Sequence, residues 1–395
     1  PKMPAHRLRI TSSASGRAIY FDNAATSFPK PDGVAEAVYD YIKFNGMNIG
    51  RGVYEKAFTS AEGVYETREA LCGLFNFSKP SNVIFTVNVT EALNMIIKGL
   101  LRPGDHVIVS SLEHNSVMRP LTQLLKSGVS FDRAPCDSEG NSFGVEELIR
   151  DNTKAVIFSH ASNVCGTIAP MEKIGEICKK HGLIFIADCA QSGGSVNVDM
   201  ERMNIDVLCF TGHKSLLGPQ GTGGFIIRDE TVPLIEPLIS GGTGSVSDLE
   251  TVPDFLPDRF EAGTLNIAGI YGLKAGLEFI KRIGVDNIHR REMELTKRFL
   301  DGVRELGGCR IVGKKGVEGR TPVVSLDMEE DVSETAFRLD REYGIMTRVG
   351  MHCAPNAHRA LGTFPKGTIR FSFGYFNSEE EIDTAVEALR KITNR

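Results

Sequence analysis

The sequence lacks the features that mark several classes of protein. No apolar run approaches the length that a bilayer-spanning helix needs, so an integral membrane protein is not expected. The basic stretch at residues 1–17 has no apolar core of the kind found in secretory signals, and we expect no export signal there. No basic stripe is present and the formal net charge is −5, so nucleic acid and anionic membranes are poor candidate partners.

Cysteine is present but is not arranged for metal binding. None of the eight cysteines forms a Cys-x-x-Cys pair, so we predict no metal site. A chain of 395 residues needs no disulfides for stability, and Cys189 and Cys209 stand in apolar runs that are typical of buried free thiols. Reduced thiols favour a cytoplasmic location.

The dinucleotide fingerprint is also missing. No Gly-x-Gly-x-x-Gly segment follows the first apolar runs, and the Gly-rich segment 240–245 matches neither that spacing nor a phosphate loop. This absence disfavours a nicotinamide-dependent oxidoreductase.

The sequence does contain a regular alternation of apolar runs and amphipathic stretches between residues 82 and 228. The runs are short and rich in Val and Ile, as expected of strands buried on both faces of a mainly parallel sheet. They lie at 82–87, 106–111, 154–160, 182–188, 205–210 and 223–228. Helical patterns at 90–100, 117–128 and 171–182 separate them, so we predict an α/β domain.

The pattern changes after residue 266, and the chain length favours two domains. A long helical region is followed by strands, a helix and a closing helix, which is typical of a smaller α+β domain. These elements are predicted at 267–306, 321–328, 332–343, 368–374 and after Ser378. We expect an N-terminal arm at 1–18, a large domain at 19–265, and a small domain at 266–395 that includes part of the N-terminal segment.

Polar side chains follow two of the predicted strands at their carboxyl ends, where parallel sheets bind ligands. Lys214 comes after the strand at 205–210 among small residues and glycines, which gives a Schiff-base lysine the access that it needs. Asp188 ends another strand and suits the pyridinium nitrogen of pyridoxal 5′-phosphate (PLP), whose ring acts as an electron sink. Gln191 could donate to the ring O3′. The alternatives are a solvated loop lysine and an N-capping aspartate.

Two further segments fit the same cofactor. Thr90 stands where a strand runs into a helix, so its hydroxyl and the neighbouring amides could bind a phosphate, or Thr90 could simply cap the helix. His114 follows the strand at 106–111, where a histidine could stack on a pyridine ring and move protons. Taken alone, His114 could also be a loop histidine without a role.

An ordered set of segments resembles the class V aminotransferase-type PLP enzymes, and among them the cysteine desulfurases and selenocysteine lyases. The segments are FDNAATS (21–27), VTEALN (89–94), LEHNS (112–116), SNVCGT (162–167), ADCAQS (187–192), TGHKSLLGPQG (211–221) and FEAGTLN (260–266). The resemblance extends from about Ile19 to the C-terminus. It implies PLP as cofactor and a fold-type I large domain with a mainly parallel seven-stranded sheet.

The resemblance also implies a role for each matching residue. Lys214 would bind PLP covalently, His114 would stack on the ring, Asp188 would pair with the ring nitrogen and Gln191 with O3′. The phosphate ligands would be Thr90, Thr211 and His213, with Thr264 reaching the site of the partner subunit in a homodimer.

Substrate contacts follow from the same resemblance. Asn163 and Arg370 would bind the substrate carboxylate, which a guanidinium can hold with two parallel hydrogen bonds. Ala25 and Arg348 are further candidates for substrate binding. The alternative for Arg370 is an ordinary surface arginine at a strand end.

Cys353 lies in RVGMHCAPNAH (348–358), which resembles the corresponding segment of group II cysteine desulfurases. In that family this cysteine takes the substrate sulfur as a persulfide, so we expect conversion of L-cysteine to L-alanine and onward sulfur transfer to an acceptor protein or thiol. That sulfur would serve iron–sulfur cluster assembly or another biosynthesis. Arg348 and His352 are candidates to activate the thiolate. Alternatively, Cys353 is a small apolar residue behind a turn.

One segment departs from the family pattern. Gly50 and Tyr54 replace histidines that many group II enzymes carry, whereas Arg51 and Gly52 match. The departure affects contacts with the partner subunit and the choice between L-cysteine and L-selenocysteine. A selenocysteine lyase, another class V PLP aminotransferase or lyase without a role for Cys353, and a non-catalytic binding protein stay open as alternatives.

Overall fold

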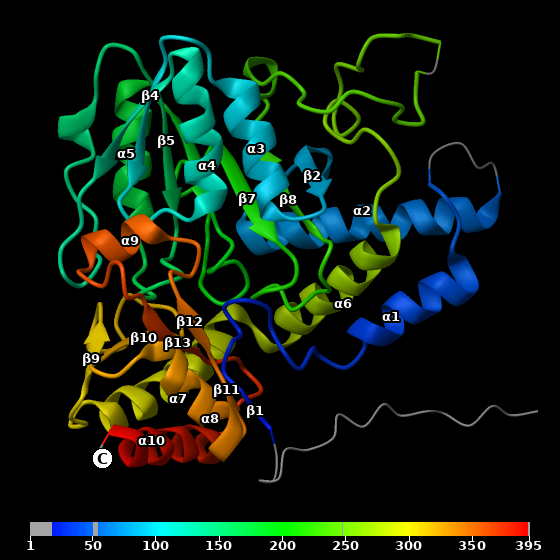
Figure 1. Ribbon diagram of the computed structural model, residues 1–395. Coiled ribbons are helices and arrows are strands. Elements are labelled where there is room, and N and C mark those ends of the chain that lie inside the picture. Colours follow the sequence, from blue (N-terminus) through cyan, green and yellow to red (C-terminus); the bar gives the residue numbers. More distant parts are fainter. Residues whose placement is uncertain (1–17, 50–53, 247, 394–395) are drawn as a thin grey trace, which may run out of the picture.

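The computed structural model describes residues 18–49, 54–246 and 248–393 (Figure 1). The predicted arm therefore lies outside the described residues except for Ala18, and so do Gly50, Arg51 and Gly52. Among the described residues, no helix combines the length and the apolar character that a membrane span requires.

A seven-stranded sheet forms the centre of the larger part of the molecule, as predicted. Within this sheet β8 alone runs antiparallel to its neighbours. In spatial order the strands are β2 (Val83–Thr86), β8 (Gly223–Ile227), β7 (Val207–Thr211), β6 (Ile184–Asp188), β5 (Thr153–Ser159), β3 (His106–Ser110) and β4 (Ser130–Ala134).

Alternate residues of the central strands enter two separate apolar clusters, one on each face. Val107 and Val109 of β3 pack with α3 (Val89–Leu100) and α4 (Asn115–Leu124). Ile108 of the same strand belongs to the cluster on the other face, which includes residues of α2 (Glu55–Phe75), α5 (Met171–His181) and α6 (Ile267–Ile283). Burial on both faces explains why these strands are apolar throughout.

The smaller part contains a four-stranded antiparallel sheet in the order β12 (Arg348–Gly350), β13 (Thr368–Ser372), β10 (Val323–Met328) and β9 (Cys309–Val312). Its apolar cluster joins the strands to α7 (Val285–Val303), α8 (Val332–Tyr343) and α10 (Glu379–Thr393). The predicted helical region at 267–306 is two helices, because the chain turns at Gly284, where φ is 88°.

The N-terminal segment runs between the two sheets. The short strand β1 (Ile19–Tyr20) pairs in parallel with β11 (Ile345–Met346), and Asp22 bridges to Ser372 of β13. Ser27 then donates its backbone N–H to the carbonyl of His213, 3.0 Å away. Residues 19–27 therefore connect the small sheet to the loop that carries Lys214.

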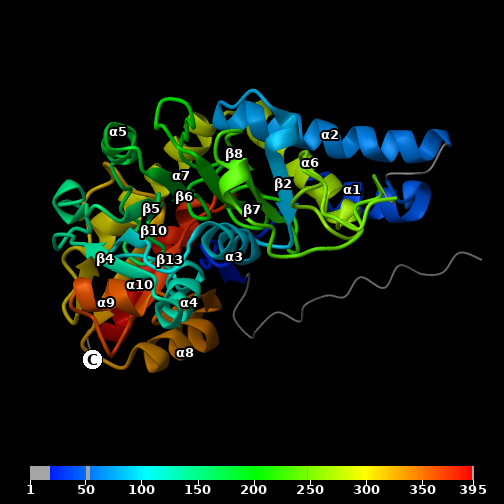
Figure 2. The ribbon, with the colours of Figure 1, turned by 90° about the horizontal axis from the view of Figure 1, so that it is seen from above.

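The helices α1 (Val34–Asp40) and α2 extend to one side of the molecule, away from α5 and α10, in both views (Figures 1 and 2). A π-helix at Tyr41–Asn45 continues α1, and α6 packs against both α1 and α2. This projecting part carries a set of exposed aromatic and aliphatic side chains.

Candidate active site

The carboxyl ends of four parallel strands, β3, β5, β6 and β7, border one cavity. Eight of the residues singled out in the sequence line it, and they come from five segments that are far apart along the chain. They are Thr90, His114, Asn163, Asp188, Gln191, Thr211, His213 and Lys214. Sequence reasoning placed these side chains at strand ends, and the parallel sheet brings those ends together.

Lys214 lies in the turn after β7, with its side chain only partly exposed. Two hydrogen bonds hold its carbonyl, from the Ser27 hydroxyl and the Leu217 backbone N–H, each at 2.9 Å. The pKa of the Lys214 amine is lowered to about 8, chiefly by burial; the Asp188 charge opposes this shift, and the cations Arg370 and Arg348 add to it. An amine with this pKa is partly neutral near pH 7, so Lys214 can act as a nucleophile or base rather than as a solvated loop lysine.

Asp188 is the last residue of β6 and is buried. Its Oδ1 accepts a hydrogen bond from the Ala190 N–H at 3.0 Å, and no helix begins after it, so the prediction of an N-capping role is wrong. Burial raises the pKa of the Asp188 carboxyl, while the Ala190 hydrogen bond and the Lys214 charge lower it. A buried carboxylate that lines the cavity and forms no ion pair among the described residues suits a protonated ring nitrogen.

His114 caps the N-terminus of α4. Its Nδ1 accepts a hydrogen bond from the Ser116 N–H at 3.0 Å and lies 2.8 Å from the Ser116 hydroxyl. Burial, followed by the charge of Lys214, lowers the pKa of His114 to about 4. The ring is therefore neutral at pH 7 and carries its proton on Nε2, so it can stack on an aromatic ligand without adding positive charge.

Other residues that line the cavity carry hydrogen-bonding groups without a partner among the described residues. Thr211 Oγ1 and His213 Nδ1 are buried and have no hydrogen-bond partner among the described residues. The N-cap of α3 is Asn88, which accepts from the Glu91 N–H at 2.9 Å, so the prediction that Thr90 caps this helix is wrong. Thr90 is the second residue of α3 and lies in its first turn, at the positive helix end. Such groups around a helix N-terminus fit a phosphate.

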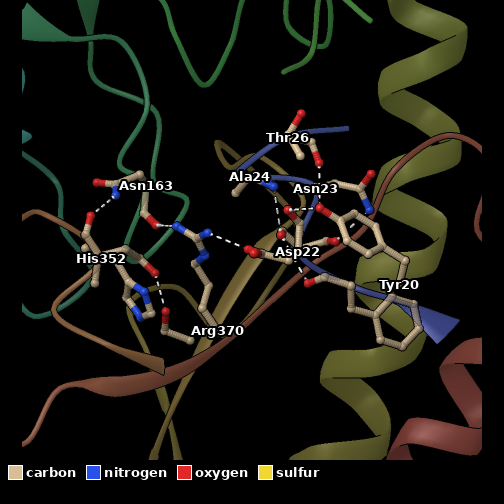
Figure 3. Close-up of polar contacts among 12 residues, drawn as sticks. Tyr20, Asp22, Asn23, Ala24, Thr26, Asn163, His352 and Arg370 are labelled. Carbon is tan, nitrogen blue, oxygen red and sulfur yellow. Dashed lines mark hydrogen bonds and ion pairs between the residues drawn. The ribbon is translucent and has the colours of Figure 1, made fainter. Parts of the chain in front are cut away.

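Arg370 joins the cavity to the small sheet (Figure 3). It lies within β13 and is only 2% exposed, so the alternative of a surface arginine is wrong. Its NH1 donates to the carbonyl of Asn163 at 3.1 Å, and its NH2 donates to Asp22 Oδ1 at 2.8 Å. Asn163 in turn donates through Nδ2 to the carbonyl of His352 at 2.6 Å. Asp22 was not predicted as a site residue, although it lies in the FDNAATS segment.

Cys353 is exposed in the turn after β12, so the prediction of an apolar residue behind a turn is wrong. Its backbone φ is 58°, and its carbonyl accepts a hydrogen bond from the Asn115 N–H at 2.8 Å. That contact fixes Cys353 next to the start of α4 and hence near His114. The carbonyl of the preceding residue, His352, accepts a hydrogen bond from Asn163, which lines the cavity, so the turn that carries Cys353 borders the cavity.

His352 does not suit the role of a neighbouring cation that would activate the thiolate. The ring is buried, and its Nε2 lies 2.9 Å from the Thr368 hydroxyl. Burial and the nearby charge of Arg370 lower the pKa of His352 to about 2, so it cannot supply a positive charge to a thiolate. Arg348 is half-buried and stays a candidate, directly opposite Arg370 in the β12–β13 pairing.

The remaining predicted residues lie at the edges of the site. Gln191 donates through Nε2 to the carbonyl of Ala24 at 3.0 Å, and the neighbouring Ala25 belongs to the turn after Asp22. Thr264 is exposed and lines a different pocket, so it does not reach the Lys214 cavity of its own chain. Tyr54 is 49% exposed just before α2.

Two ionisable side chains next to the cavity, one buried and one half-buried, were missed in the sequence. Glu113 accepts hydrogen bonds from the backbone N–H and the hydroxyl of Ser159, each at 2.8 Å, and burial raises its pKa to about 7. Lys30 donates to the His213 carbonyl at 2.9 Å, and burial lowers its pKa to about 8. The only available signals were their positions, Glu113 beside His114 and Lys30 in the turn-like FPKP.

Comparison with known proteins places these features in a family. Residues 19–385 match the family model described as aminotransferase class-V. A probable cysteine desulfurase of Methanothermobacter thermautotrophicus is 35% identical over 384 residues, which cover 95% of this chain and 94% of that one. A probable cysteine desulfurase of Pyrococcus abyssi is 36% identical over 388 residues, with the same coverage.

Solved structures give the same result. The apo structure of a cysteine desulfurase from Thermococcus onnurineus NA1 superposes with a TM-score of 0.89 at 34% identity, covering 95% of each chain. The cysteine desulfurase CsdA of Escherichia coli, in an S-sulfonic acid form, superposes with a TM-score of 0.85 at 26% identity, covering 95% of this chain and 94% of that one.

Proposed function

Because this chain belongs to the class-V aminotransferase family, we propose that it is a PLP-dependent cysteine desulfurase that converts L-cysteine to L-alanine. The relatives named above support the reaction, and PLP is the cofactor of such enzymes. One structural observation carries the proposal. Lys214 and the buried Asp188 line one cavity, and the exposed Cys353 lies in a turn that hydrogen bonds from Asn115 and Asn163 hold beside it.

PLP, when bound, supplies an electron sink that stabilises the negative charge formed when the substrate Cα loses its proton. Asp188 would hold a proton on the ring nitrogen, and the neutral His114 would lie against the ring. The phosphate would be held by Thr90, Thr211 and His213. The unpartnered hydroxyl and ring nitrogen of the last two support this assignment.

Lys214 is the base that we assign to the Cα proton. Its amine is attached through a turn whose backbone is fixed by Ser27 and Leu217, and its pKa of about 8 leaves a useful neutral fraction near pH 7. Arg370, with Asn163 beside it, would orient the substrate through its carboxylate.

Cys353 is the group that we assign to the sulfur. Its thiolate attacks the substrate sulfur, the bond between that sulfur and Cβ breaks, and the three-carbon fragment takes up protons to become L-alanine. One thiol and one L-cysteine thus give one persulfide and one L-alanine, and no external oxidant is needed. The exposure of Cys353 lets a second thiol, on an acceptor protein or a small molecule, remove the sulfur.

The activity can be tested directly on the purified protein reconstituted with PLP. With L-cysteine and a reducing thiol, we expect L-alanine and sulfide to form in equal amounts. A protein that binds PLP but forms no L-alanine would contradict the proposed function. Rates measured with L-selenocysteine on the same preparation test the lyase alternative, which the comparisons do not favour.

We also propose a homodimer in which Thr264 reaches the site of the partner subunit. Support comes from the exposed apolar side chains on the projecting part formed by α1, the π-helix and α2, since patches of this kind mark interaction surfaces. The side chains are Tyr39, Ile42, Phe44, Phe58 and Tyr65, each more than half exposed. The placement of Thr264 away from the Lys214 cavity of its own chain agrees with this arrangement.

Sedimentation should show a species of twice the 43.2 kDa chain mass for the wild type. The double substitution Ile42→Glu, Phe58→Glu places charge in this patch and is expected to give monomers, while Phe337→Glu, which alters an equally exposed side chain on α8, should leave the dimer intact. A monomeric wild type, or a dimer that survives the double substitution, would count against this surface.

A cytoplasmic location is proposed as well. All eight cysteines are free, which fits a reducing compartment.

A further inference from the structure

Asp22 and Arg370 form an ion pair at the place assigned to the substrate carboxylate (Figure 3). The guanidinium is almost fully buried, and the Asp22 side chain is 21% exposed, so the pair closes the solvent side of Arg370. The distance from NH2 to Oδ1 is 2.8 Å, while Arg370 Nε has no hydrogen-bond partner among the described residues. The Asp22 carboxylate therefore already binds the NH2 group of Arg370, the guanidinium that a substrate carboxylate would use.

A second arginine lies directly across from this pair. Arg348 and Arg370 are opposed residues of the antiparallel strands β12 and β13. Arg348 is half-buried, and within the described ranges its side chain has no hydrogen bond and no ion pair. Directly opposed residues of an antiparallel pair project to the same face of the sheet, so Arg348 lies on the same side as Arg370.

The charges at this end of the cavity do not cancel. Two guanidinium groups face one carboxylate, Asp22, which leaves one uncompensated positive charge. The nearby His114 and His352 are neutral at pH 7, because burial lowers the pKa of His114 to about 4 and that of His352 to about 2. The positive charge of Lys214 is balanced by the nearby carboxylate of Asp188. A ligand with a single carboxylate would bring this end of the site to neutrality.

We propose that Asp22 is a specificity-determining residue of this enzyme: by neutralising one charge of the Arg370–Arg348 pair, it restricts the site to amino acids that carry one carboxylate and rejects ligands with a second anionic group. The inference rests on the proposed function only in placing the substrate carboxylate at Arg370. Without Asp22 the site would present two unpaired guanidinium groups, which together match a dianion.

The competing role for Asp22 is simply to orient Arg370. Arg370 has a second restraint, however, because its NH1 donates to the Asn163 carbonyl and its side chain is enclosed within the small sheet. If Asp22 only orients Arg370, loss of the Asp22 charge should weaken the binding of every carboxylate ligand by a similar factor. If Asp22 acts through its charge, removing that charge should increase the binding affinity more for dianions than for monoanions.

The test compares propionate with malonate on the PLP-loaded protein, because neither acid has an amino group that could react with the cofactor. Their dissociation constants are measured by calorimetry, and their competitive inhibition against L-cysteine is measured at low ionic strength. For Asp22→Asn we expect malonate binding to tighten by at least about tenfold and propionate binding by about threefold, since a dianion gains more from the removed negative charge. Parallel changes for both acids, or weaker binding of both, would overturn the proposal.

Two further variants serve as controls for the role of the Asp22 charge. Asp22→Glu keeps the charge and should keep the wild-type ratio of the two dissociation constants; a ratio shifted toward malonate in this variant would contradict the charge role. Asp327→Asn removes the carboxylate of another Asp–Arg pair on the same sheet, with Arg310 at 3.0 Å, and should change neither constant. Calorimetry needs no sulfur chemistry, so a protein that makes no L-alanine would still report on Asp22.

Discussion

The variant Lys214→Ala should lose both the visible absorption of bound PLP and at least about a thousandfold of the L-cysteine desulfurase activity. Lys214 supplies the amine that holds the cofactor covalently and the base that takes the Cα proton, and no other lysine among the described residues lines the cavity. The absorption spectrum after incubation with PLP and removal of the excess, together with L-alanine formation, measures the two losses separately.

Lys126→Ala is a suitable control for this variant, because Lys126 is an exposed lysine in the turn after α4 and touches no part of the cavity. It should bind PLP and form L-alanine at the wild-type rate. If Lys214→Ala kept a PLP absorption band that survives gel filtration and kept its activity, another group would have to hold the cofactor, and the assignment of Lys214 would be wrong.

For Cys353→Ala we expect normal PLP absorption but a loss of at least about a thousandfold in sulfide release from L-cysteine, because the variant lacks the nucleophile that takes the sulfur. The side chain is exposed, so the fold should not change. The loss with L-selenocysteine should be smaller, because selenium can leave without transfer to a thiol.

The matched control is Cys309→Ala, which removes a half-buried thiol from β9, an edge strand of the small sheet. It should retain wild-type activity with both substrates. Sulfide release at the wild-type rate in Cys353→Ala would show that sulfur leaves without a persulfide on this residue, and the chain would then be another kind of class V PLP lyase.

Most of the large sheet could be predicted because six of its strands are buried on both faces and are apolar throughout. β4 was missed because it is an edge strand with half-exposed residues, so Ser130–Ala134 shows no continuous apolar run. β1 was missed because two residues give no periodic signal. Seven of the eight cavity residues could be placed because strand ends meet at one edge of the sheet, and Asn163 was placed by the family resemblance alone.

Contacts between distant segments could not be predicted in the same way. Asp22 and Arg370 are 348 positions apart and meet only because β1 pairs with β11 and Asp22 bridges to β13. The neutrality of His352 depends on its burial, which the sequence alone did not reveal. In both cases the electrostatic environment is set by tertiary packing, which leaves no local pattern.

The central claim is that Cys353 receives sulfur from L-cysteine, and mass spectrometry tests it most directly. The PLP-loaded protein is mixed with L-cysteine in the absence of other thiols, excess substrate is removed, and the peptide that contains Cys353 is analysed. We expect one added sulfur atom on Cys353, removable by a reducing thiol and absent in Lys214→Ala. A Cys353 peptide without added sulfur, from protein that has formed L-alanine, would contradict the account.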